Sequence, residues 1–338
     1  MLDNLFCCIS EPGDAVLLPR PYYAVFEFDV QCKAGSTIVG VETVGVQPEV
    51  KGVERYYPTL KGLEKARDSA LQQGLNPKVL LICQPNNPIS VCYPKHVMEL
   101  VWEFAEKHGM HLVSDEIYGA GIHAKQADFW SISRLAADKG RTLGDYVHVI
   151  YALSKDFASS GLRCGMMYSE NQQVLKSMRK LNDLCQISSH TQWGLSRVFS
   201  DTEWIEDFLS KANSRLNDRF KLVKKSLEPE GVKVIEAEAG LFCWLDCRSW
   251  LEENTWDAEK KLYQQFFDEA KVLLTPGYSM RTEQPGYFRC CFATHEEVFN
   301  EGMKRLKDFG ADKLRIEELE EESDDWQTGK YGKFPTTT

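Results

Sequence analysis

The sequence predicts an α/β fold, with a mostly parallel sheet in a large first domain and a smaller α+β domain after it. Two observations lead to this prediction. Short, unbroken apolar stretches alternate with helical patterns as far as about Thr202, which is typical of parallel strands buried on both faces. Beyond that point a long amphipathic stretch leads into a different order of elements. A chain of 338 residues is long enough for both domains.

The elements of the large domain are predicted in the following order. A helical face made by Leu2, Leu5, Phe6 and Ile9 comes first and stops at the turn Glu11-Pro12-Gly13-Asp14. Strands are expected at Ala15–Leu18, Thr37–Val41, Val79–Cys83, His111–Ser114, Val147–Leu153 and Cys164–Tyr168. Helices are expected at Leu60–Gln73 and from Pro94 to about Lys107, with proline in its favoured place at a helix start.

The second domain is expected to begin with the long helix Trp204–Leu227. Strands are predicted at Val232–Ile235, Leu241–Leu245 and Phe288–Phe292, with helices between them. We therefore predict a large domain over 1–207, a small domain over 208–312, and a terminal segment over 313–338. In that last segment the acidic run Glu317–Asp325 predicts a solvated helix end, and Gln327–Thr338 predicts a disordered tail.

The composition argues against several classes of protein. The net charge of −10 argues against nucleic acid as the main partner, because the phosphate backbone attracts basic surfaces. No apolar run is long enough to span a membrane, and no basic region precedes the first apolar stretch as in a signal peptide. The eleven cysteines include no CxxC pair, which favours reduced thiols in the cytoplasm over a zinc site.

Polar side chains follow three of the predicted strands. Asn87 follows the first in Gln84-Pro85-Asn86-Asn87-Pro88, Asp115 ends the second, and Lys155 follows the third. Ligands of open α/β sheets bind beyond the carboxyl ends of the strands, so these side chains are candidates for one site. Each also has an ordinary interpretation: an Asn-Pro turn, an aspartate that caps the next turn, or a surface lysine.

The chemistry of these groups suits a flat, phosphorylated aldehyde with a pyridine ring. Desolvation lowers the pKa of a lysine, and the neutral amine of Lys155 could then form a Schiff base with an aldehyde. A buried aspartate needs a cation, which a protonated pyridine nitrogen would provide for Asp115. Tyr118 could reach the same ring, and the aromatic pair Tyr22-Tyr23 could stack on it.

The sequence also contains a pattern that is typical of a different cofactor site. Gly119-Ala120-Gly121-Ile122-His123-Ala124 matches the GxGxxA pattern of dinucleotide-binding folds. However, Asp115 and Glu116 lie between the strand and the glycines, where they would repel a pyrophosphate, and Lys125–Trp130 is a poor helix start. This alternative is weak.

Taken together, the segments resemble fold-type I pyridoxal-phosphate enzymes, and among them the 1-aminocyclopropane-1-carboxylate (ACC) synthase-like branch of the class I/II aminotransferases. The resemblance is carried, in the family's order, by Pro19-Arg20-Pro21-Tyr22-Tyr23, Pro85-Asn86-Asn87-Pro88, Ser114-Asp115-Glu116-Ile117-Tyr118, Ser154-Lys155-Asp156-Phe157 through Gly161-Leu162-Arg163, and Pro285-Gly286-Tyr287-Phe288-Arg289-Cys290-Cys291-Phe292-Ala293. It implies an aspartate aminotransferase-like large domain.

The resemblance also implies roles for individual residues. Lys155 would hold the aldehyde of pyridoxal 5′-phosphate and move the substrate's α-proton. Asp115 would pair with the ring nitrogen, Asn87 and Tyr118 with the ring hydroxyl oxygen, and Tyr23 would stack on the ring. Arg163 would bind the phosphate. Arg289 would clamp the substrate carboxylate with a two-pronged contact that lysine cannot copy.

The expected function is a pyridoxal-phosphate enzyme acting on an α-amino acid. We expect transamination with a keto acid, because it is the commonest activity on this scaffold. ACC synthase-type γ-elimination, or C–S or β-lyase chemistry, remains an alternative, as does a non-catalytic protein that keeps the fold. The resemblance further implies a homodimer with the site near the subunit interface, around Ser189 to Gln192.

Three departures from the family pattern affect the phosphate site. The family has a further N-terminal segment with a glycine-rich helix start, so we expect this chain to be N-terminally truncated relative to it. Ala152 stands where the family has a serine, and Ser154 would replace it only in part. Ser90 stands where a glycine is usual. We therefore expect a weaker grip on the phosphate.

Overall fold

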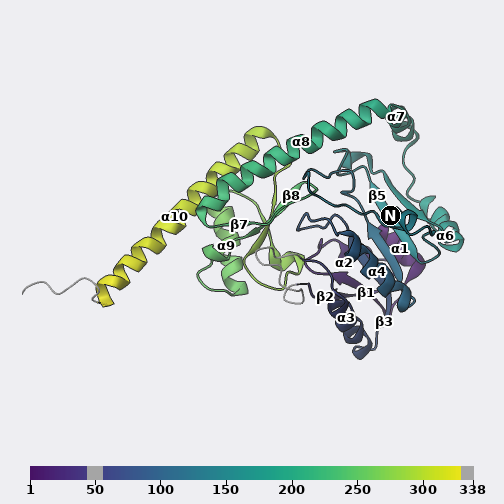
Figure 1. Ribbon diagram of the computed structural model, residues 1–338, viewed down its shortest axis with the longest axis horizontal. Helices are drawn as coiled ribbons and strands as arrows, with labels where there is room; N and C mark the ends of the chain where they lie inside the picture. The colour runs from purple at the N-terminus through teal and green to yellow at the C-terminus, as the bar shows by residue number, and fades with distance from the viewer. Residues whose placement is uncertain (44–55, 329–338) are drawn as a thin grey trace, which may run out of the picture.

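The large sheet has six strands, in the order β2-β1-β3-β4-β5-β6, in the computed structural model of the chain (Figure 1). The structure describes residues 1–43 and 56–328, with side chains as far as residue 313. Neighbouring strands pair in parallel except β5 and β6, which are antiparallel. The prediction of a mostly parallel sheet is confirmed.

The elements of the large domain agree closely with the apolar pattern of the sequence. Its strands are β1 (Asp14–Pro19), β2 (Thr37–Val41), β3 (Asn76–Cys83), β4 (His111–Asp115), β5 (Val147–Ala152) and β6 (Gly165–Ser169). Its helices are α1 (Leu2–Ile9), α2 (Phe26–Gln31), α3 (Leu60–Gln72), α4 (Lys95–Lys107), α5 (Ile132–Asp138), α6 (Gln172–Asn182) and α7 (Ser189–Phe199).

Apolar side chains fill both faces of the sheet, which explains the unbroken apolar strands. On one face Leu17 and Leu80 pack with residues of α3, α4 and α5. On the other face Val16 and Leu81 pack with residues of α1, α2 and α6. Because successive strand side chains point to opposite faces, only continuous apolar stretches serve both layers.

The second sheet is small and antiparallel, in the order β7-β8-β10-β9. The second domain, which contains this sheet, is made of α8 (Thr202–Leu227), β7 (Lys233–Val234), β8 (Phe242–Asp246), α9 (Trp256–Asp268), β9 (Thr275–Pro276), β10 (Tyr287–Cys291) and α10 (Glu296–Thr328). Phe220, Phe266, Phe288 and Leu306 form its core. The expected α+β unit is therefore present, while the domain boundaries at 207/208 and 312/313 stay predictions.

Sequence analysis missed several short elements. Helices α2, α5, α6 and α7 and strand β9 were not predicted, and α7 buries none of its own side chains. Helix α8 begins two residues earlier than expected because Asp201 accepts a hydrogen bond from the Trp204 N–H, at 2.9 Å.

The expectations for the terminal segment are only partly covered by the structure. The acidic run lies within α10, which continues to Thr328. Residues 329–338 of the predicted tail lie outside the described residues. Among those that are described, no helix combines the length and the apolar character that a membrane span requires.

Candidate active site

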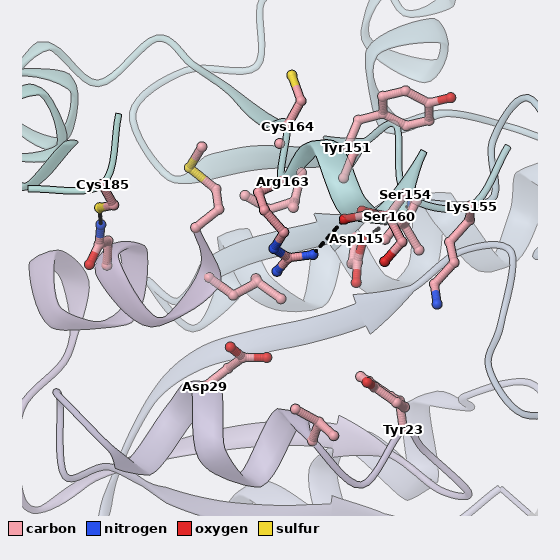
Figure 2. A pocket seen from close by; sticks show the side chains of 18 of the residues that line it. Tyr23, Asp29, Asp115, Tyr151, Ser154, Lys155, Ser160, Arg163, Cys164 and Cys185 are labelled. Atoms are coloured by element: carbon pink, nitrogen blue, oxygen red, sulfur yellow. Dashed lines mark hydrogen bonds between the residues drawn. The ribbon is translucent and has the colours of Figure 1, made fainter. Parts of the chain in front are cut away.

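A cavity of about 840 Å³ lies beyond the carboxyl ends of β3, β4 and β5 (Figure 2). Of the side chains that sequence analysis singled out, those that line the cavity are Tyr23, Asn87, Asp115, Tyr118, Ser154, Lys155 and Arg163. They converge because the strands are parallel and in register, with Cys83 opposite Asp115 and Asp115 opposite Ile150.

Asp115 is a buried acid without a cationic partner. Its side chain is 5% exposed, and its Oδ1 accepts a hydrogen bond from the Ile117 N–H at 3.2 Å. Burial raises the pKa of this carboxyl to about 7. Among the described residues, none forms an ion pair with Asp115, so a cation from outside the chain would lower the free energy of the ionised form.

Lys155 is the amine of the cavity. It lies in the turn after β5 and is partly exposed, rather than buried as the sequence suggested. Figure 2 shows its Nζ directed into the cavity from the wall opposite Tyr23. Within the part of the chain that is described, Nζ has no hydrogen-bond or ion-pair partner, which leaves it available to a ligand.

A chain of hydrogen bonds leads from Arg289 to Tyr118. The Arg289 guanidinium donates to Asn87 Oδ1 at 2.9 Å, and Asn87 Nδ2 donates to the Tyr118 hydroxyl at 3.4 Å. A second guanidinium nitrogen lies 3.3 Å from Thr275 Oγ1, and Nε is buried without a partner. Arg289 is not among the residues that line the cavity; the structure places it behind Asn87, at the edge.

Arg163 extends into the cavity from the turn before β6 (Figure 2). Its backbone is left-handed, with φ of +52°, and its guanidinium donates to the Ser160 carbonyl at 3.0 Å. Asp29 of α2, which sequence analysis did not identify, faces it from the opposite wall. Burial raises the pKa of Asp29. Because α2 is only six residues long, its sequence gave little sign that Asp29 would face a site.

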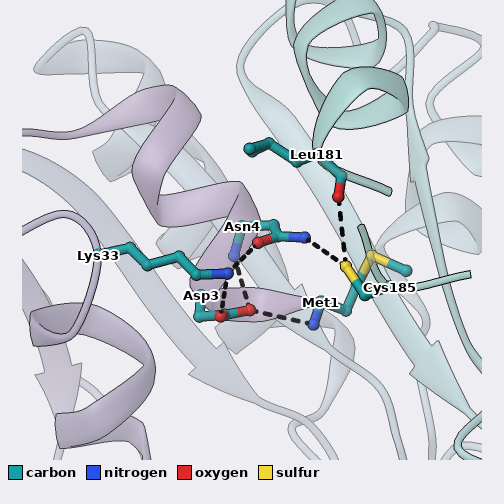
Figure 3. A network of polar contacts seen from close by, with 6 residues as sticks. All are labelled: Met1, Asp3, Asn4, Lys33, Leu181 and Cys185. Atoms are coloured by element: carbon teal, nitrogen blue, oxygen red, sulfur yellow. Dashed lines mark hydrogen bonds and ion pairs between the residues drawn. The ribbon is translucent and has the colours of Figure 1, made fainter. Parts of the chain in front are cut away.

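Polar contacts between α1 and the end of α6 form one rim of the cavity (Figure 3). Lys33 Nζ lies 2.7 Å from Asp3 Oδ2 and also donates to Asn4 Oδ1. Asn4 Nδ2 in turn donates to Cys185 Sγ at 3.4 Å. Asn4 and Cys185 line the cavity, so this network holds two of its wall segments together.

Ala152 and Ser90, the two residues that were expected to weaken phosphate binding, lie in different surroundings. Ala152 lines the cavity, as expected. Ser90 does not: it takes the left-handed conformation that glycine favours, with φ of +64°, and donates from Oγ to the Phe242 carbonyl at 2.7 Å. Ser90 therefore joins the segment after β3 to β8, and its effect on phosphate binding stays a prediction.

The dinucleotide alternative is not supported. The segment with Gly119 and Gly121 continues as irregular chain, and the next helix starts only at Ile132. There is thus no helix N-terminus at the glycines to receive a pyrophosphate. The described side chains also contain no cluster of three or more potential metal ligands.

The model of one protein family matches most of the chain. Residues 1–306 match the family described as "Aminotransferase class I and II". The chain belongs to this family. Enzymes of the class I and II aminotransferase family use pyridoxal 5′-phosphate, which is the cofactor expected from the strand-end residues.

Several curated relatives are ACC synthases of plants. The chain is 34% identical to 1-aminocyclopropane-1-carboxylate synthase 11 of Arabidopsis thaliana over 91% of its own length, and 32% identical to synthase 2 of Solanum lycopersicum over 87%. It spans 65% of the Arabidopsis protein and 60% of the tomato protein. A synthase of Vigna radiata var. radiata is 34% identical, with 85% of this chain and 76% of that protein covered.

Solved structures share the fold. Aspartate aminotransferase of Thermotoga maritima superposes with a TM-score of 0.74 at 24% identity, covering 91% of this chain and 72% of that one. The aromatic aminotransferase of Pyrococcus horikoshii superposes with a TM-score of 0.77 at 21% identity, covering 93% and 77%. The prediction of an aspartate aminotransferase-like fold is therefore confirmed.

The residues present fit this family's cofactor. Asp115 is a buried carboxyl with no ion-pair partner among the described residues, and a protonated pyridine nitrogen would provide such a partner. Arg163 offers a guanidinium to a phosphate, and Asn87 and Tyr118 present neighbouring polar atoms at the cavity wall. The roles of the individual residues stay predictions.

Proposed function

We propose that this chain acts on an α-amino acid with pyridoxal 5′-phosphate and that its reaction is transamination with a keto acid. One observation carries the proposal: a lysine amine and a buried acid, both without ion-pair partners among the described residues, meet in one cavity with an arginine behind its wall. The cofactor, when bound, supplies an aldehyde that bonds an amine and a ring that withdraws electrons from the substrate's α-carbon.

Each protein group then has a definite task. Asp115 would accept the hydrogen bond of the ring nitrogen and keep that nitrogen protonated. Asn87 and Tyr118 would donate to the ring hydroxyl oxygen, Tyr23 would provide an aromatic surface for stacking, and Arg163 with Ser154 would bind the phosphate.

Lys155 and Arg289 act on the substrate. Arg289 is held by Asn87 and Thr275 and would present its remaining donors to the α-carboxylate. Lys155 Nζ, in its neutral form, would take the α-proton and return it at a neighbouring atom; it is partly shielded from water and has no partner among the described residues. Where the proton returns decides the reaction.

A second candidate is elimination of a substituent at the γ-carbon, as in ACC synthesis. The observation that favours it is the 31–34% identity to proteins named ACC synthases. C–S lyase and β-lyase reactions likewise eliminate a substituent from the amino acid. All of these reactions share the removal of the α-proton by Lys155.

We further propose a cytoplasmic homodimer. The eleven cysteines are all free, which suits a reducing compartment. Large apolar side chains on and around α7 are exposed next to the cavity wall, as a partner subunit would require.

The first test is cofactor binding. We expect the purified chain to develop a visible absorption band with pyridoxal 5′-phosphate, and borohydride to fix the cofactor on Lys155 in a peptide map. Lys155→Ala should lose both signals. No band in either protein would contradict the proposed function and favour a non-catalytic role.

The second test separates the reaction classes. The loaded protein is incubated with candidate amino acids, with and without pyruvate or 2-oxoglutarate. A new keto acid together with the amino acid made from the acceptor would support transamination. A product that forms without an acceptor, such as a cyclic amino acid or a thiol, would overturn it in favour of elimination.

A further inference from the structure

Asp156, the residue after Lys155, bonds to segments from two strand ends. Its side chain is 7% exposed. Its Oδ2 accepts hydrogen bonds from the Ala120 N–H at 2.8 Å and from the Tyr151 hydroxyl at 3.0 Å. Tyr151 belongs to β5, whereas Ala120 belongs to the turn that follows β4. One carboxylate therefore joins the Lys155 turn to the neighbouring strand end.

The turn that receives this bond also carries Tyr118. The Gly121 N–H donates to the Tyr118 carbonyl at 3.0 Å, which closes the turn around Ala120. From the other side, Asn213 of α8 donates to the Ala120 carbonyl at 3.0 Å. The Ala120 residue is thus held at both its N–H and its carbonyl, and its position determines where Tyr118 lies.

The Lys155 turn is equally restricted. The Ala158 N–H donates to the Lys155 carbonyl at 2.9 Å, and the Ser159 N–H donates to the Leu153 carbonyl at 3.2 Å. Because these bonds close the turn on itself, fixing Asp156 also fixes the backbone of Lys155.

The Asp156 carboxylate also lies close to Gly121, the residue after Ala120. A Cβ atom placed on Gly121 would lie 2.7 Å from Asp156 Oδ1, nearer than real Cβ contacts allow. A methyl group at 121 would therefore force the Asp156 carboxylate to shift, which gives the second glycine of the apparent dinucleotide motif a role in this contact.

We propose that Asp156 is a positioning residue, which sets the distance between Lys155 and the Tyr118–Asn87 pair by joining their two turns. Asp156 does not line the cavity, so it acts through Lys155 rather than on a ligand. The consequence for catalysis rests on the proposed function, whereas the consequence for the two turns does not.

The test compares Asp156→Ala and Asp156→Asn with Tyr151→Phe. Tyr151→Phe is the matched control, because it removes one donor and leaves the bond to Ala120. The first readout is hydrogen exchange of the peptide spanning residues 118–123 in the cofactor-free chain. We expect exchange at Ala120 to rise at least tenfold in Asp156→Ala, and less than threefold in Tyr151→Phe.

The second readout is the steady-state activity of the chain with pyridoxal 5′-phosphate bound. We expect kcat to fall at least tenfold in Asp156→Ala while KM for the amino acid changes less than threefold, because Arg289 is untouched. Asp156→Asn keeps an acceptor oxygen and should recover part of both effects. If the parent chain has no activity, the exchange readout alone still decides the proposal.

A merely structural role predicts a different pattern. In that case Asp156→Ala would lower the melting temperature while exchange at 118–123 and kcat stay at parental values, and this result would overturn the proposal. If Asp156→Ala does not fold, Gly121→Ala replaces it: the added methyl group pushes on the same carboxylate, and we expect the same local exchange and kcat changes. Parental behaviour of folded Gly121→Ala would also overturn the proposal.

Discussion

Asp115 is deeply buried and forms no ion pair among the described residues, and its raised pKa makes the cofactor-free chain sensitive to pH. The folded-state pKa of about 7 lies above the ordinary aspartate value of 3.8. Below about pH 4 the carboxyl is protonated in both states. Between pH 4 and 7 the unfolded chain releases the proton and the folded chain keeps it, so the free energy of unfolding falls as pH rises.

We predict that Asp115→Asn removes this pH dependence in the cofactor-free chain. Asparagine stays neutral and can still accept from the Ile117 N–H. Relative to the parent, the variant should gain a few kcal/mol of unfolding free energy between pH 4 and 7, at about 1.4 kcal/mol per unit of pKa. Urea unfolding of both proteins at several pH values measures this difference. The other titrating groups are the same in the two proteins, so their contributions cancel. A difference that does not change with pH would contradict the prediction.

Arg289 illustrates why the kind of cation matters at a single position. Its guanidinium already bonds Asn87 and Thr275, so only a forked side chain has donors left for a carboxylate. We predict that Arg289→Lys raises KM for the amino acid by roughly 10- to 100-fold, in line with the loss of a charge-assisted hydrogen bond of about 1.5–3 kcal/mol. Steady-state kinetics on the loaded enzyme measures it.

Arg248→Lys is the matched control for that experiment. Arg248 pairs with Asp246 at 2.6 Å, at one end of the small sheet, and it does not line the cavity. We expect KM to stay within about twofold of the parent. An equal rise of KM in both variants would mean that Arg289 acts on the stability of the small sheet and not on the substrate.

At the scale of elements, several helices begin where a side chain satisfies a backbone donor. Thr59 caps α3, with its Oγ1 accepting from the Gly62 N–H at 3.1 Å, and Thr255 caps α9 by accepting from the Ala258 N–H at 3.2 Å. These caps stop the first turns from being left with unpaired N–H groups.

We predict that Thr59→Ala lowers the free energy of unfolding by about 1 kcal/mol, and that Thr59→Ser leaves it nearly unchanged. Thr255→Ala provides the same chemical change in the small domain. Denaturant unfolding of the three variants is the measurement. If Thr59→Ser costs as much as Thr59→Ala, the lost methyl group and not the cap would be the cause.

At the scale of the whole molecule, the two sheets are joined through packing as well as through α8. Trp244, Met280 and Tyr287 of the second unit belong to the same core as the large sheet, and the Tyr22 N–H donates to the Met280 carbonyl at 2.9 Å. Arg281 and Glu27 add an ion pair of 2.7 Å between the same two units. This packing brings Arg289 of the small sheet up to Asn87 of the large one.

The surface around α7 supports the homodimer proposal and gives a test of it. Leu184 is 87% exposed and Trp193 66% exposed, next to residues that line the cavity. We predict that Trp193→Glu shifts the chain from dimer to monomer at micromolar concentration in sedimentation experiments. Trp256→Glu, on the exposed start of α9, is the control and should stay dimeric. A parent chain that is monomeric throughout would contradict the homodimer itself.

Much of this molecule could be predicted from local sequence. Unbroken apolar stretches predict strands buried on both faces, because both layers of helices need apolar side chains. Polar residues at three strand ends predict the site, because parallel strands end at one edge of the sheet. Asn87, Asp115 and Lys155 were identified in this way.

Other features depended on contacts between distant segments. Asp29 lies on a short helix without a clear pattern, and Asp156 acquires its partners only when the ends of β4 and β5 meet. Arg289 was expected to clamp the substrate carboxylate, and the packing of the two sheets places it behind Asn87. The sequence by itself determined which elements form and which chemical groups reach the site, since apolar periodicity and turn residues act locally. Only the tertiary structure decided which of those groups are paired, because the partner of a buried charge comes from wherever the chain folds back.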